Sequence, residues 1–488
     1  MRILSASKPV RTASTSAKGP RIRADPIVVC SHRGPYVFER SGDRVVARRG
    51  GGGLIGAVAP LIEQFGGTWI AAALKEGDRE AAAELDTGDP FDLELLDIPR
   101  DAHALHYDVV SNEYLWFLFH YLFDTATLPV FDARFEEAWD AYRHVNEVYA
   151  DAVAAAGPPR AVLVQDYHLM LLPTMLRERR VRRPVLYFHH TPWCAPEYFS
   201  FLPSAIRGQL LGGLLDADVV GFHCSRWAEA FRACCERFVP KARIEGDAVV
   251  HGRRSTQVVV APVPVDADKL AAEAADERTE QWAQHHEEMR GSRKLLLRVD
   301  RIDLSKNPLR GFLAFEMLLE RKPSLARDVW FLAQLYPSRE TLEAYRRYFA
   351  ACTGVVRRIN ERFPDTEPVT LHFEDDYYRS LGAMRVYDVL LVNPVFDGLN
   401  LVAKEGSLVN ARDGVLVLSE NAGVFEELGK ASLPVNPFDV SATADTVERA
   451  LNMPGTERRK LAARARKLSI ASTPQSWART QLAAAGLD

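Results

Sequence analysis

Residues 389–428 read VLLVNPVFDGLNLVAKEGSLVNARDGVLVLSENAGVFEEL. The apolar run at 389–392 predicts a buried strand, and an irregular loop follows it before a helix begins near Leu401. A second apolar run at 415–418 predicts another strand, which ends at a glycine-containing turn. In an open α/β sheet, ligands bind beside the carboxyl ends of parallel strands, and free backbone N–H groups at a helix start favour phosphate. The stretch therefore predicts an α/β fold with a nucleotide site at this sheet edge.

The bulk composition describes a soluble globular protein of two domains. The chain has 488 residues, 47% of them hydrophobic and 26% charged, and this length exceeds what one ordinary core supports. The formal net charge of −4 supplies no basic field for nucleic acid and no polybasic membrane patch. No run of 18 apolar residues is present. We therefore expect neither a nucleic-acid nor a membrane partner.

The cysteines and the first residues favour a reduced, cytoplasmic protein. Six scattered cysteines form no CxxC pair, which makes a disulfide framework or a structural zinc site improbable. Residues 1–25 are rich in Ser, Thr, Lys and Arg and lack the apolar core of a signal peptide. We expect this segment to be a disordered tail.

Two series of alternating strands and helices predict two Rossmann-like domains with parallel sheets. The two prolines of VAPVPVDAD at 260–268 mark the expected hinge. One long polar helix is expected after it, at 271–289. The expected regions are 26–265 as the first domain, 266–465 as the second domain with the predicted nucleotide site, and 466–488 as a final helix that packs back on the first domain.

Two segments at predicted strand ends contain groups that suit a phosphorylated ligand. The glycines at 50–53 lie between a first strand and a helix, where backbone without Cβ atoms can approach a phosphate or a sugar. Arg301 and Lys306 follow the strand at 295–299, and two such cations can hold a diphosphate without a divalent metal. The acidic triplets at 216–218 and 266–268 are interpreted as structural.

A carboxylate and an imidazole follow two further buried strands. Asp166 lies in QDYH after the strand at 161–164, and His190 lies in FHHTPW after the strand at 185–189. Neighbouring strand ends would place these groups close enough to act as an acid–base pair. Taken singly, each histidine is more often a structural residue.

These segments resemble the trehalose-6-phosphate synthases, a family of retaining sugar-nucleotide glycosyltransferases. DGLNLVAKE and GVLVLSENAG match the donor loop of that family, VDRIDLSK is similar to VDRLDxxKG, and QDYH and FHHTPW are similar to HDYHL and LHxPFP. The likeness runs from residue 27 to residue 453. It implies the GT-B architecture, in which two Rossmann-like domains face a central cleft. It also implies transfer without a protein nucleophile, a cofactor or a metal.

The resemblance assigns roles residue by residue. Arg301 and Lys306 would stabilise the leaving diphosphate, His190 would donate to the transferred sugar near its 6-hydroxyl, and Asp166 would bind acceptor hydroxyls. The donor set is Gly53, Arg301, Lys306, Asp397, Gly398, Leu399, Asn400, Leu401 and Glu405, the last of these a carboxylate that can bind ribose hydroxyls. The acceptor set for glucose 6-phosphate is Arg33, Tyr107, Trp116, Asp166 and Arg339, of which Arg33 and Arg339 have no other partner evident in the sequence.

Three departures from the family pattern concern the acceptor and the nucleobase. Ala72 replaces a tryptophan, Phe396 replaces an arginine, and Gln165 replaces a histidine. Similar departures occur in actinobacterial members that use GDP-glucose and in the pseudoglycosyltransferase that makes validoxylamine phosphate.

The leading expectation is therefore transfer of glucose from a nucleoside-diphosphate glucose, with GDP favoured over UDP, to glucose 6-phosphate. A synthase with another phosphorylated acceptor, of the validoxylamine-phosphate or glucosylglycerol-phosphate type, is the nearest alternative. A silent regulatory protein would be free to lose its diphosphate-binding residues, and no pair of carboxylates points to a hydrolase. The sequence leaves the oligomeric state open, including a homo-oligomer.

Overall fold

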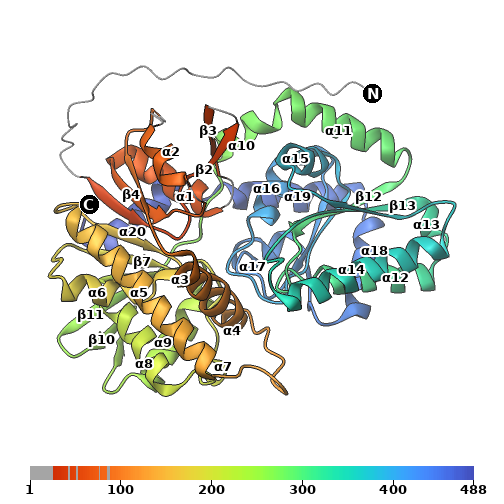
Figure 1. Cartoon of the computed structure of the whole chain (residues 1–488). Helices are drawn as coiled ribbons and strands as arrows, with labels where there is room; N and C mark the ends of the chain where they lie inside the picture. Colours follow the sequence, from red (N-terminus) through yellow and green to blue (C-terminus); the bar gives the residue numbers. More distant parts are fainter. Residues whose placement is uncertain (1–25, 42–43, 51–52, 76, 85–87, 488) are drawn as a thin grey trace.

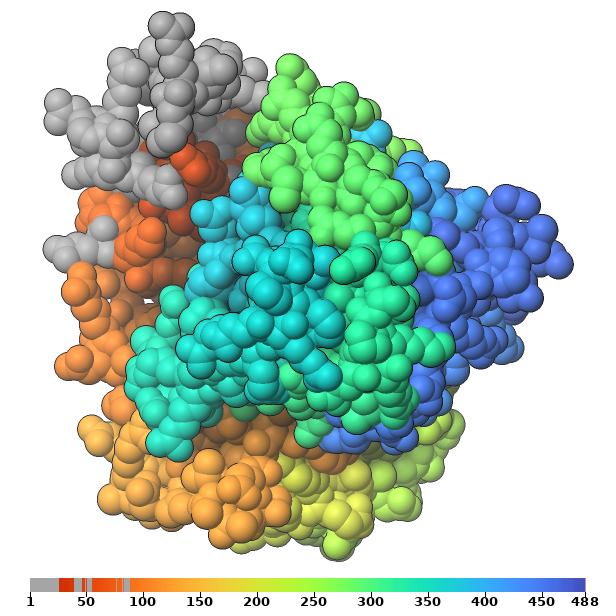
Figure 2. Space-filling view, turned by 90° about the vertical axis from the view of Figure 1, so that its right-hand side faces the viewer, coloured from red at the N-terminus to blue at the C-terminus, as the bar shows by residue number. Residues whose placement is uncertain are grey.

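The computed structural model describes residues 26–41, 44–50, 53–75, 77–84 and 88–487. The expected disordered tail lies outside these ranges. Two sheets with helices on their faces form two domains that lie side by side (Figure 1), and the space-filling view shows them meeting along a broad boundary (Figure 2). This confirms the expected α/β class. No helix of the described ranges is long and apolar enough to span a membrane.

The first sheet has nine strands, and its first six in space follow a doubly wound order. Counted along the chain without the β2–β3 hairpin, these six run 3-2-1-4-5-6, and all are parallel. The seventh strand, β11, is parallel to the sixth. The eighth strand pairs antiparallel with the seventh, and the ninth pairs antiparallel with the eighth. In spatial order they are β5 (Asp92–Leu96), β4 (Gly67–Ala72), β1 (Ile27–Cys30), β6 (Val162–Gln165), β7 (Val185–Phe188), β8 (Val219–Phe222), β11 (Arg254–Val260), β10 (Ala248–His251) and β9 (Arg243–Glu245). The hairpin is β2 (Tyr36–Ser41) with β3 (Arg44–Arg49).

The second sheet has six parallel strands in the same 3-2-1-4-5-6 order. In spatial order they are β14 (Val369–Phe373), β13 (Val329–Tyr336), β12 (Lys294–Arg301), β15 (Val389–Val392), β16 (Val415–Ser419) and β17 (Leu433–Val435). Two of its inner strands, β15 and β16, are short, almost wholly apolar and buried, as a sheet covered by helices on both faces requires.

Helices cover the faces of both sheets. Those of the first domain are α1 (Gly53–Phe65), α2 (Asp78–Glu84), α3 (Arg100–Ala104), the π-helix η1 (Leu105–Leu115), α4 (Trp116–Phe119), α5 (Ala133–Ala155), η2 (Tyr167–Leu169), α6 (Leu172–Glu178), α7 (Pro196–Phe199), α8 (Ser204–Leu215) and α9 (Ser225–Phe238). Those of the second are α10 (Ala267–Ala274), α11 (Glu277–Arg290), α12 (Pro308–Arg321), α13 (Leu325–Asp328), α14 (Glu343–Arg362), α15 (Tyr377–Val386), α16 (Leu401–Val409), α17 (Phe425–Leu428), η3 (Gly429–Ala431), α18 (Val440–Leu451) and α19 (Gly455–Ser469).

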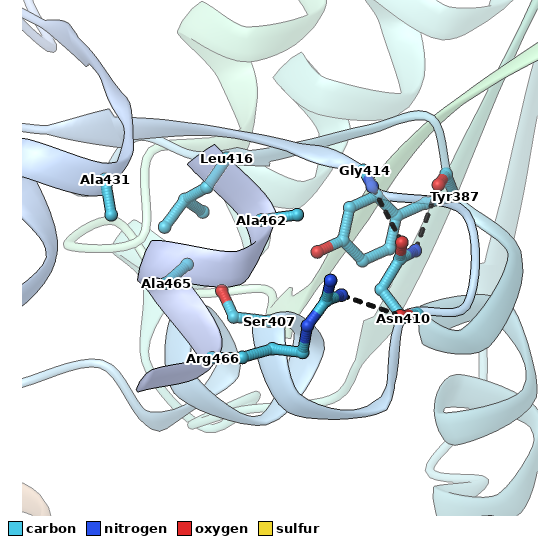
Figure 3. A pocket seen from close by; sticks show the side chains of 9 residues that line it. All are labelled: Tyr387, Ser407, Asn410, Gly414, Leu416, Ala431, Ala462, Ala465 and Arg466. Carbon is cyan, nitrogen blue, oxygen red and sulfur yellow. Dashed lines mark hydrogen bonds between the residues drawn. The ribbon is translucent and has the colours of Figure 1, made fainter. Parts of the chain in front are cut away.

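Two helix boundaries differ from the sequence-based expectation. The single polar helix expected at 271–289 is instead α10 and α11, because Asp276 caps a new helix start by accepting from the Arg278 N–H at 3.0 Å. The expected boundary at 465/466 falls inside α19. Arg466 of this helix donates to the Asn410 carbonyl at 3.4 Å, and Asn410 holds the Gly414 N–H at 2.7 Å (Figure 3).

The last helix, α20 (Pro474–Ala484), packs on the first domain. Trp477 is buried, its indole N–H donates to the Ala261 carbonyl at 3.0 Å, and its ring lies 5.2 Å from that of Phe188. Since β11 ends at Val260 and α10 begins at Ala267, the chain crosses between the sheets beside this helix. One apolar cluster joins residues of both sheets with Trp477.

Candidate active site at the switch points of the two sheets

The two loops predicted for the donor follow β12 and β15, the neighbouring strands where the second sheet reverses its order. Lys306 Nζ lies 2.5 Å from Asp397 Oδ2, and the Asn400 amide donates to the same oxygen at 3.0 Å. Burial lowers the pKa of Lys306, but the Asp397 carboxylate outweighs burial and the pKa is raised. Burial raises the pKa of Asp397, but Lys306 outweighs it and the pKa is lowered. The two groups are therefore an ion pair at neutral pH.

Arg301 ends β12 and points its charge toward the first domain. Its guanidinium carbon lies 5.5 Å from the centre of the Trp116 ring. No carboxylate of the described residues lies within ion-pair distance of it, whereas Lys306 is paired. Arg301 is therefore the cation of this loop that is most available to an anionic ligand.

Four residues that the sequence did not single out fix the backbone beside Lys306. Arg298 is fully buried, donates to the Lys306 carbonyl and the Asn393 amide oxygen, and pairs with Asp300 at 2.9 Å. Asn307 has a φ of 61°, and its amide donates to the Asn393 carbonyl at 3.0 Å. An arginine inside the apolar run of β12 was the one signal in the sequence that could have revealed this network.

Three further residues of the predicted donor set lie at helix-associated positions. Gly53 is the first residue of α1, and the glycines at 51–52 lie outside the described ranges. Leu401 is the first residue of α16. Glu405 lies one turn further along and is half-buried, and burial, followed by the charge of Glu273, raises the pKa of Glu405 to about 7. The Glu405 carboxylate has no hydrogen bond or ion pair with another described residue.

Asp166 follows β6 at the switch point of the first sheet and meets His190, which follows the neighbouring strand β7. Asp166 Oδ1 accepts from the His190 backbone N–H at 3.1 Å, and the His190 Nε2 lies 2.9 Å from the Gln165 Oε1. Burial raises the pKa of Asp166 to about 7, against the opposing effect of backbone N–H donors. Burial also lowers the pKa of His190 to about 3, so this imidazole is neutral. Gln165, where the family has histidine, therefore orients a neutral ring.

Arg339 has a full set of partners, contrary to the expectation that it had none. It follows β13, and its Nη1 lies 2.6 Å from Asp303 Oδ2. Its Nε donates to the Asn112 Oδ1 of the first domain at 2.8 Å, and its guanidinium carbon lies 3.8 Å from the centre of the Trp116 ring. Asp303 is fully buried. Burial raises the pKa of Asp303, but Arg339 and Arg301 outweigh burial and lower it to about 2.

The remaining predicted acceptor residues lie beside a histidine cluster. Arg33 Nη2 donates to the Tyr107 hydroxyl at 3.0 Å. The Tyr107 ring stacks on His32 with 4.4 Å between ring centres, and His103 and His168 lie within 5.1 Å of His32. Burial, followed by the charges of neighbouring histidines and Arg33, lowers the pKa of His32 well below its usual value. Arg33 is thus the exposed cation of a group that otherwise stays neutral.

Of two family departures, Phe396 packs between the domains and Ala72 lies within the first domain. The Phe396 side chain offers no polar group to the diphosphate loop, whereas an arginine at this position would. Its ring instead stacks on Tyr121 of the first domain, with 4.3 Å between ring centres, and lies 6.3 Å from that of Trp227. Ala72 ends β4 and is buried.

Four of the nine described non-glycine residues with a positive φ angle lie at this site. Asp166, Asn307, Arg339 and Asn400 have φ angles of 71°, 61°, 46° and 86°. Such conformations are costly for residues other than glycine, and they cluster at functional sites, where the surrounding structure enforces them. Each of the four follows a strand at one of the two sheet edges that meet.

The acidic triplets have structural roles. Asp216 accepts from a threonine hydroxyl at 2.6 Å, Asp218 pairs with an arginine at 2.6 Å, and Asp266 caps α10. Across the ranges that the structure describes, no three or more His, Cys, Asp or Glu side chains are grouped so that they could hold a metal ion. All six cysteines are buried and unpaired.

Two doubly wound sheets whose switch-point residues meet at a shared boundary define a GT-B glycosyltransferase. The chain belongs to glycosyltransferase family 20, whose sequence model matches residues 25–486. The fold and the family expected from the sequence are thereby confirmed.

Named relatives agree with this assignment. The trehalose-6-phosphate synthase of Mycobacterium marinum is 34% identical over 474 residues, covering 93% of this chain and 92% of that protein. The probable α,α-trehalose-phosphate synthase [UDP-forming] 2 of Arabidopsis thaliana is 31% identical over 457 residues, covering 91% of this chain and 54% of that protein. The chain thus spans about half the length of the Arabidopsis relative. A solved structure described as trehalose-6-phosphate from E. coli bound with UDP-2-fluoro glucose has a TM-score of 0.82 at 27% identity, covering 93% and 97% of the two chains.

Proposed function

We propose that this protein transfers glucose, with retention of configuration, from a nucleoside-diphosphate glucose to glucose 6-phosphate, giving α,α-trehalose 6-phosphate and the nucleoside diphosphate. One observation carries the proposal. Arg301 and the Lys306–Asp397 pair lie at the switch point of the second sheet, and Asp166 and His190 lie at the ends of the neighbouring strands β6 and β7 of the first. The two named relatives, both trehalose-phosphate synthases by name, support the choice of sugar and acceptor.

In the proposed reaction the bond between the anomeric carbon and the diphosphate oxygen breaks, and a bond to the 1-hydroxyl oxygen of the acceptor forms on the same face. The hydroxyl proton passes to the departing phosphate oxygen. Arg301 and Lys306 stabilise the charge that develops on the diphosphate, and Asp397 and Asn400 hold the sugar hydroxyls. The neutral His190 donates to the transferred sugar, and Asp166 accepts from the acceptor. No protein nucleophile takes part, so positioning and charge stabilisation supply the catalysis.

The acceptor phosphate would bind between Arg33 and Arg339, which approach from the two domains. The exposed Arg33 is bonded to the Tyr107 hydroxyl, and the Arg339 guanidinium lies over the face of the Trp116 ring. A phosphate offers enough oxygen atoms to accept from Arg339 while that residue keeps its bond to Asp303. The cytoplasmic location and any homo-oligomer stay predictions.

A substrate panel tests the function. Purified protein is mixed with UDP-, GDP- or ADP-glucose and with glucose 6-phosphate or glucose, and release of nucleoside diphosphate is followed. We expect glucose 6-phosphate to exceed glucose by about 10- to 100-fold in kcat/KM, because charge-assisted hydrogen bonds to phosphate are each worth about 1.5–3 kcal/mol. Equal rates with both sugars would contradict a phosphate site. No transfer to glucose 6-phosphate, with transfer to another phosphorylated acceptor, would support the validoxylamine-phosphate or glucosylglycerol-phosphate alternative.

The same panel decides the nucleobase. GDP-glucose is favoured by the resemblance to actinobacterial members of the family, and no contact among the described residues bears on the nucleobase. The Arabidopsis relative is named UDP-forming and the E. coli structure is described with a UDP sugar, so UDP-glucose is the competing donor. A higher kcat/KM for UDP-glucose at saturating glucose 6-phosphate would show that the choice was wrong, with the enzyme class unchanged.

Activity should fall in acid because Asp166 becomes protonated. Its pKa of about 7 means that the carboxylate is ionised above pH 7 and protonated below it, whereas His190, with a pKa of about 3, keeps one charge state throughout. At saturating donor, kcat/KM for glucose 6-phosphate should fall by up to about tenfold per pH unit below 7. The profile is measured from pH 5 to 9 for the wild type and for Asp166→Asn. If the slower Asp166→Asn variant shows the same fall of kcat/KM below pH 7, the group that titrates is not Asp166.

A further inference from the structure

The first turn of α9 belongs to the first domain but contacts the donor loop of the second. Trp227 is 2% exposed, and its indole N–H donates to the Gly398 carbonyl at 3.0 Å. Glu426 of the second domain accepts from the backbone N–H groups of Ser225 and Arg226 at 2.8 and 3.0 Å. The carboxylate thus satisfies two of the N–H groups that a helix start leaves without an intrahelical partner.

Backbones from both domains are stacked at this contact without room for side chains. A Cβ atom on Gly398 would lie 2.0 Å from the His190 carbonyl oxygen. A Cβ atom on Gly423 would lie 2.0 Å from the Gly398 carbonyl oxygen and 3.2 Å from Trp227 Nε1. The Gly398 peptide is therefore held between His190 and Trp227 of one domain and Gly423 of its own.

This contact determines the geometry of the strained donor loop. Asn400 has a φ of 86°, and such a conformation persists only where neighbouring groups enforce it. The Gly423 N–H holds the Asp397 carbonyl at 3.0 Å, while Trp227 holds the next carbonyl, that of Gly398. Without the indole N–H, the buried Gly398 carbonyl would lose its partner across the boundary.

We infer that Trp227 is a positioning residue for the donor nucleotide sugar, and this inference rests on the proposed function. Trp227 touches the loop and not the reacting atoms. It places the side chains of Asp397 and Asn400 opposite Lys306 only while the two domains are in contact, so donor binding is coupled to the contact between the domains.

The test is Trp227→Phe, which keeps an aromatic ring and removes the N–H donor. Calorimetric titration with UDP, GDP and ADP should show that the dissociation constant of whichever nucleotide the wild type binds most tightly rises about tenfold. The KM for the sugar nucleotide should rise in parallel, and the KM for glucose 6-phosphate should change by less than about twofold.

The matched control is Trp477→Phe. Trp477 is also 2% exposed and also donates its indole N–H to a backbone carbonyl, that of Ala261, at 3.0 Å. This variant should leave nucleotide binding unchanged. Equal effects of the two variants, or none in either, would overturn the inference and leave the proposed function standing. A wild-type protein that binds none of UDP, GDP and ADP would overturn both the inference and the proposed function, so the wild type is measured first.

A second variant covers the case in which Trp227→Phe does not fold. Glu426 is exposed, and Glu426→Ala removes the carboxylate at the start of α9 while leaving the core intact. Nucleotide binding should weaken about threefold, whereas Glu448→Ala, which removes a half-buried carboxylate paired with Lys322, should not change it. Unchanged binding in Glu426→Ala would contradict coupling through this helix start.

Discussion

Replacing Lys306 with Ala should reduce glucose transfer by about two to three orders of magnitude, the usual effect of removing one group that stabilises charge in a transition state. The side chain is largely buried, and its ammonium group lies 2.5 Å from Asp397 Oδ2. The variant loses a cation next to the departing diphosphate and also frees a buried carboxylate there, so both effects oppose the build-up of negative charge. The measurement is kcat at saturating donor and acceptor.

Lys322→Ala is the matched control, because Lys322 also pairs with a carboxylate of the second domain but is 53% exposed. Its kcat should stay near that of the wild type. Turnover of Lys306→Ala close to normal would contradict a role for this residue in leaving-group stabilisation. If Arg301 and Lys306 carry that role alone, wild-type activity should also survive EDTA, and restoration only by an added divalent metal would show that the cations are insufficient.

The strands could be predicted from the sequence because most are buried on both faces. Runs such as those at 162–165, 185–188 and 389–392 are almost wholly apolar, since a parallel sheet covered by helices leaves no polar face. The residues at their carboxyl ends could then be proposed as a site, since the 3-2-1-4-5-6 order brings these ends to one edge.

The residues that hold the site residues in place could not be predicted, because their roles depend on partners far away in the chain. The π-helix η1 buries Ser111 and Asn112 in a segment with no clear helical period, and Asn112 contacts Arg339 across 227 positions. Burial of the Arg298 guanidinium with Asp300 and Asn393 likewise depends on the meeting of β12 and β15. Propensity and periodicity describe one element at a time, so pairs of this kind appear only once the elements are packed.

Replacing Arg339 with Ala should weaken acceptor binding and destabilise the protein at the same time. The loss of a charge-assisted contact to phosphate should raise the KM for glucose 6-phosphate by about 10- to 100-fold. The variant also leaves Asp303, which is fully buried, without its main cation, and breaking such a pair costs about 3–5 kcal/mol. The thermal midpoint of unfolding should therefore fall by several degrees.

A second substitution separates the two effects. In Arg339→Ala/Asp303→Asn the buried charge is gone, while the Tyr345 hydroxyl and the Ser305 N–H can still bond residue 303. The thermal midpoint should return most of the way toward that of the wild type, and the KM for glucose 6-phosphate should stay high. Recovery of both quantities would show that Arg339 acts only through the stability of this loop.

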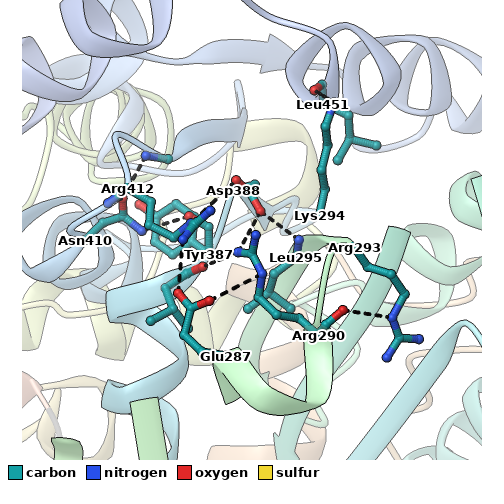
Figure 4. A network of polar contacts seen from close by, with 12 residues as sticks. Glu287, Arg290, Arg293, Lys294, Leu295, Tyr387, Asp388, Asn410, Arg412 and Leu451 are labelled. Atoms are coloured by element: carbon teal, nitrogen blue, oxygen red, sulfur yellow. Dashed lines mark hydrogen bonds and ion pairs between the residues drawn. The ribbon is translucent and has the colours of Figure 1, made fainter. Parts of the chain in front are cut away.

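Arg290→Ala is the control variant, which should lose stability without losing a contact to the acceptor. Arg290 is 7% exposed, as is the Arg339 side chain, and its guanidinium pairs with the buried Asp388 at 3.1 Å in a network within the second domain (Figure 4). This variant should lower the thermal midpoint comparably and leave the acceptor KM unchanged. A rise in acceptor KM that simply follows the loss of stability in both single variants would contradict a phosphate contact. A rise confined to the Arg339 variants assigns that contact to Arg339, because the two arginines differ in position and not in burial.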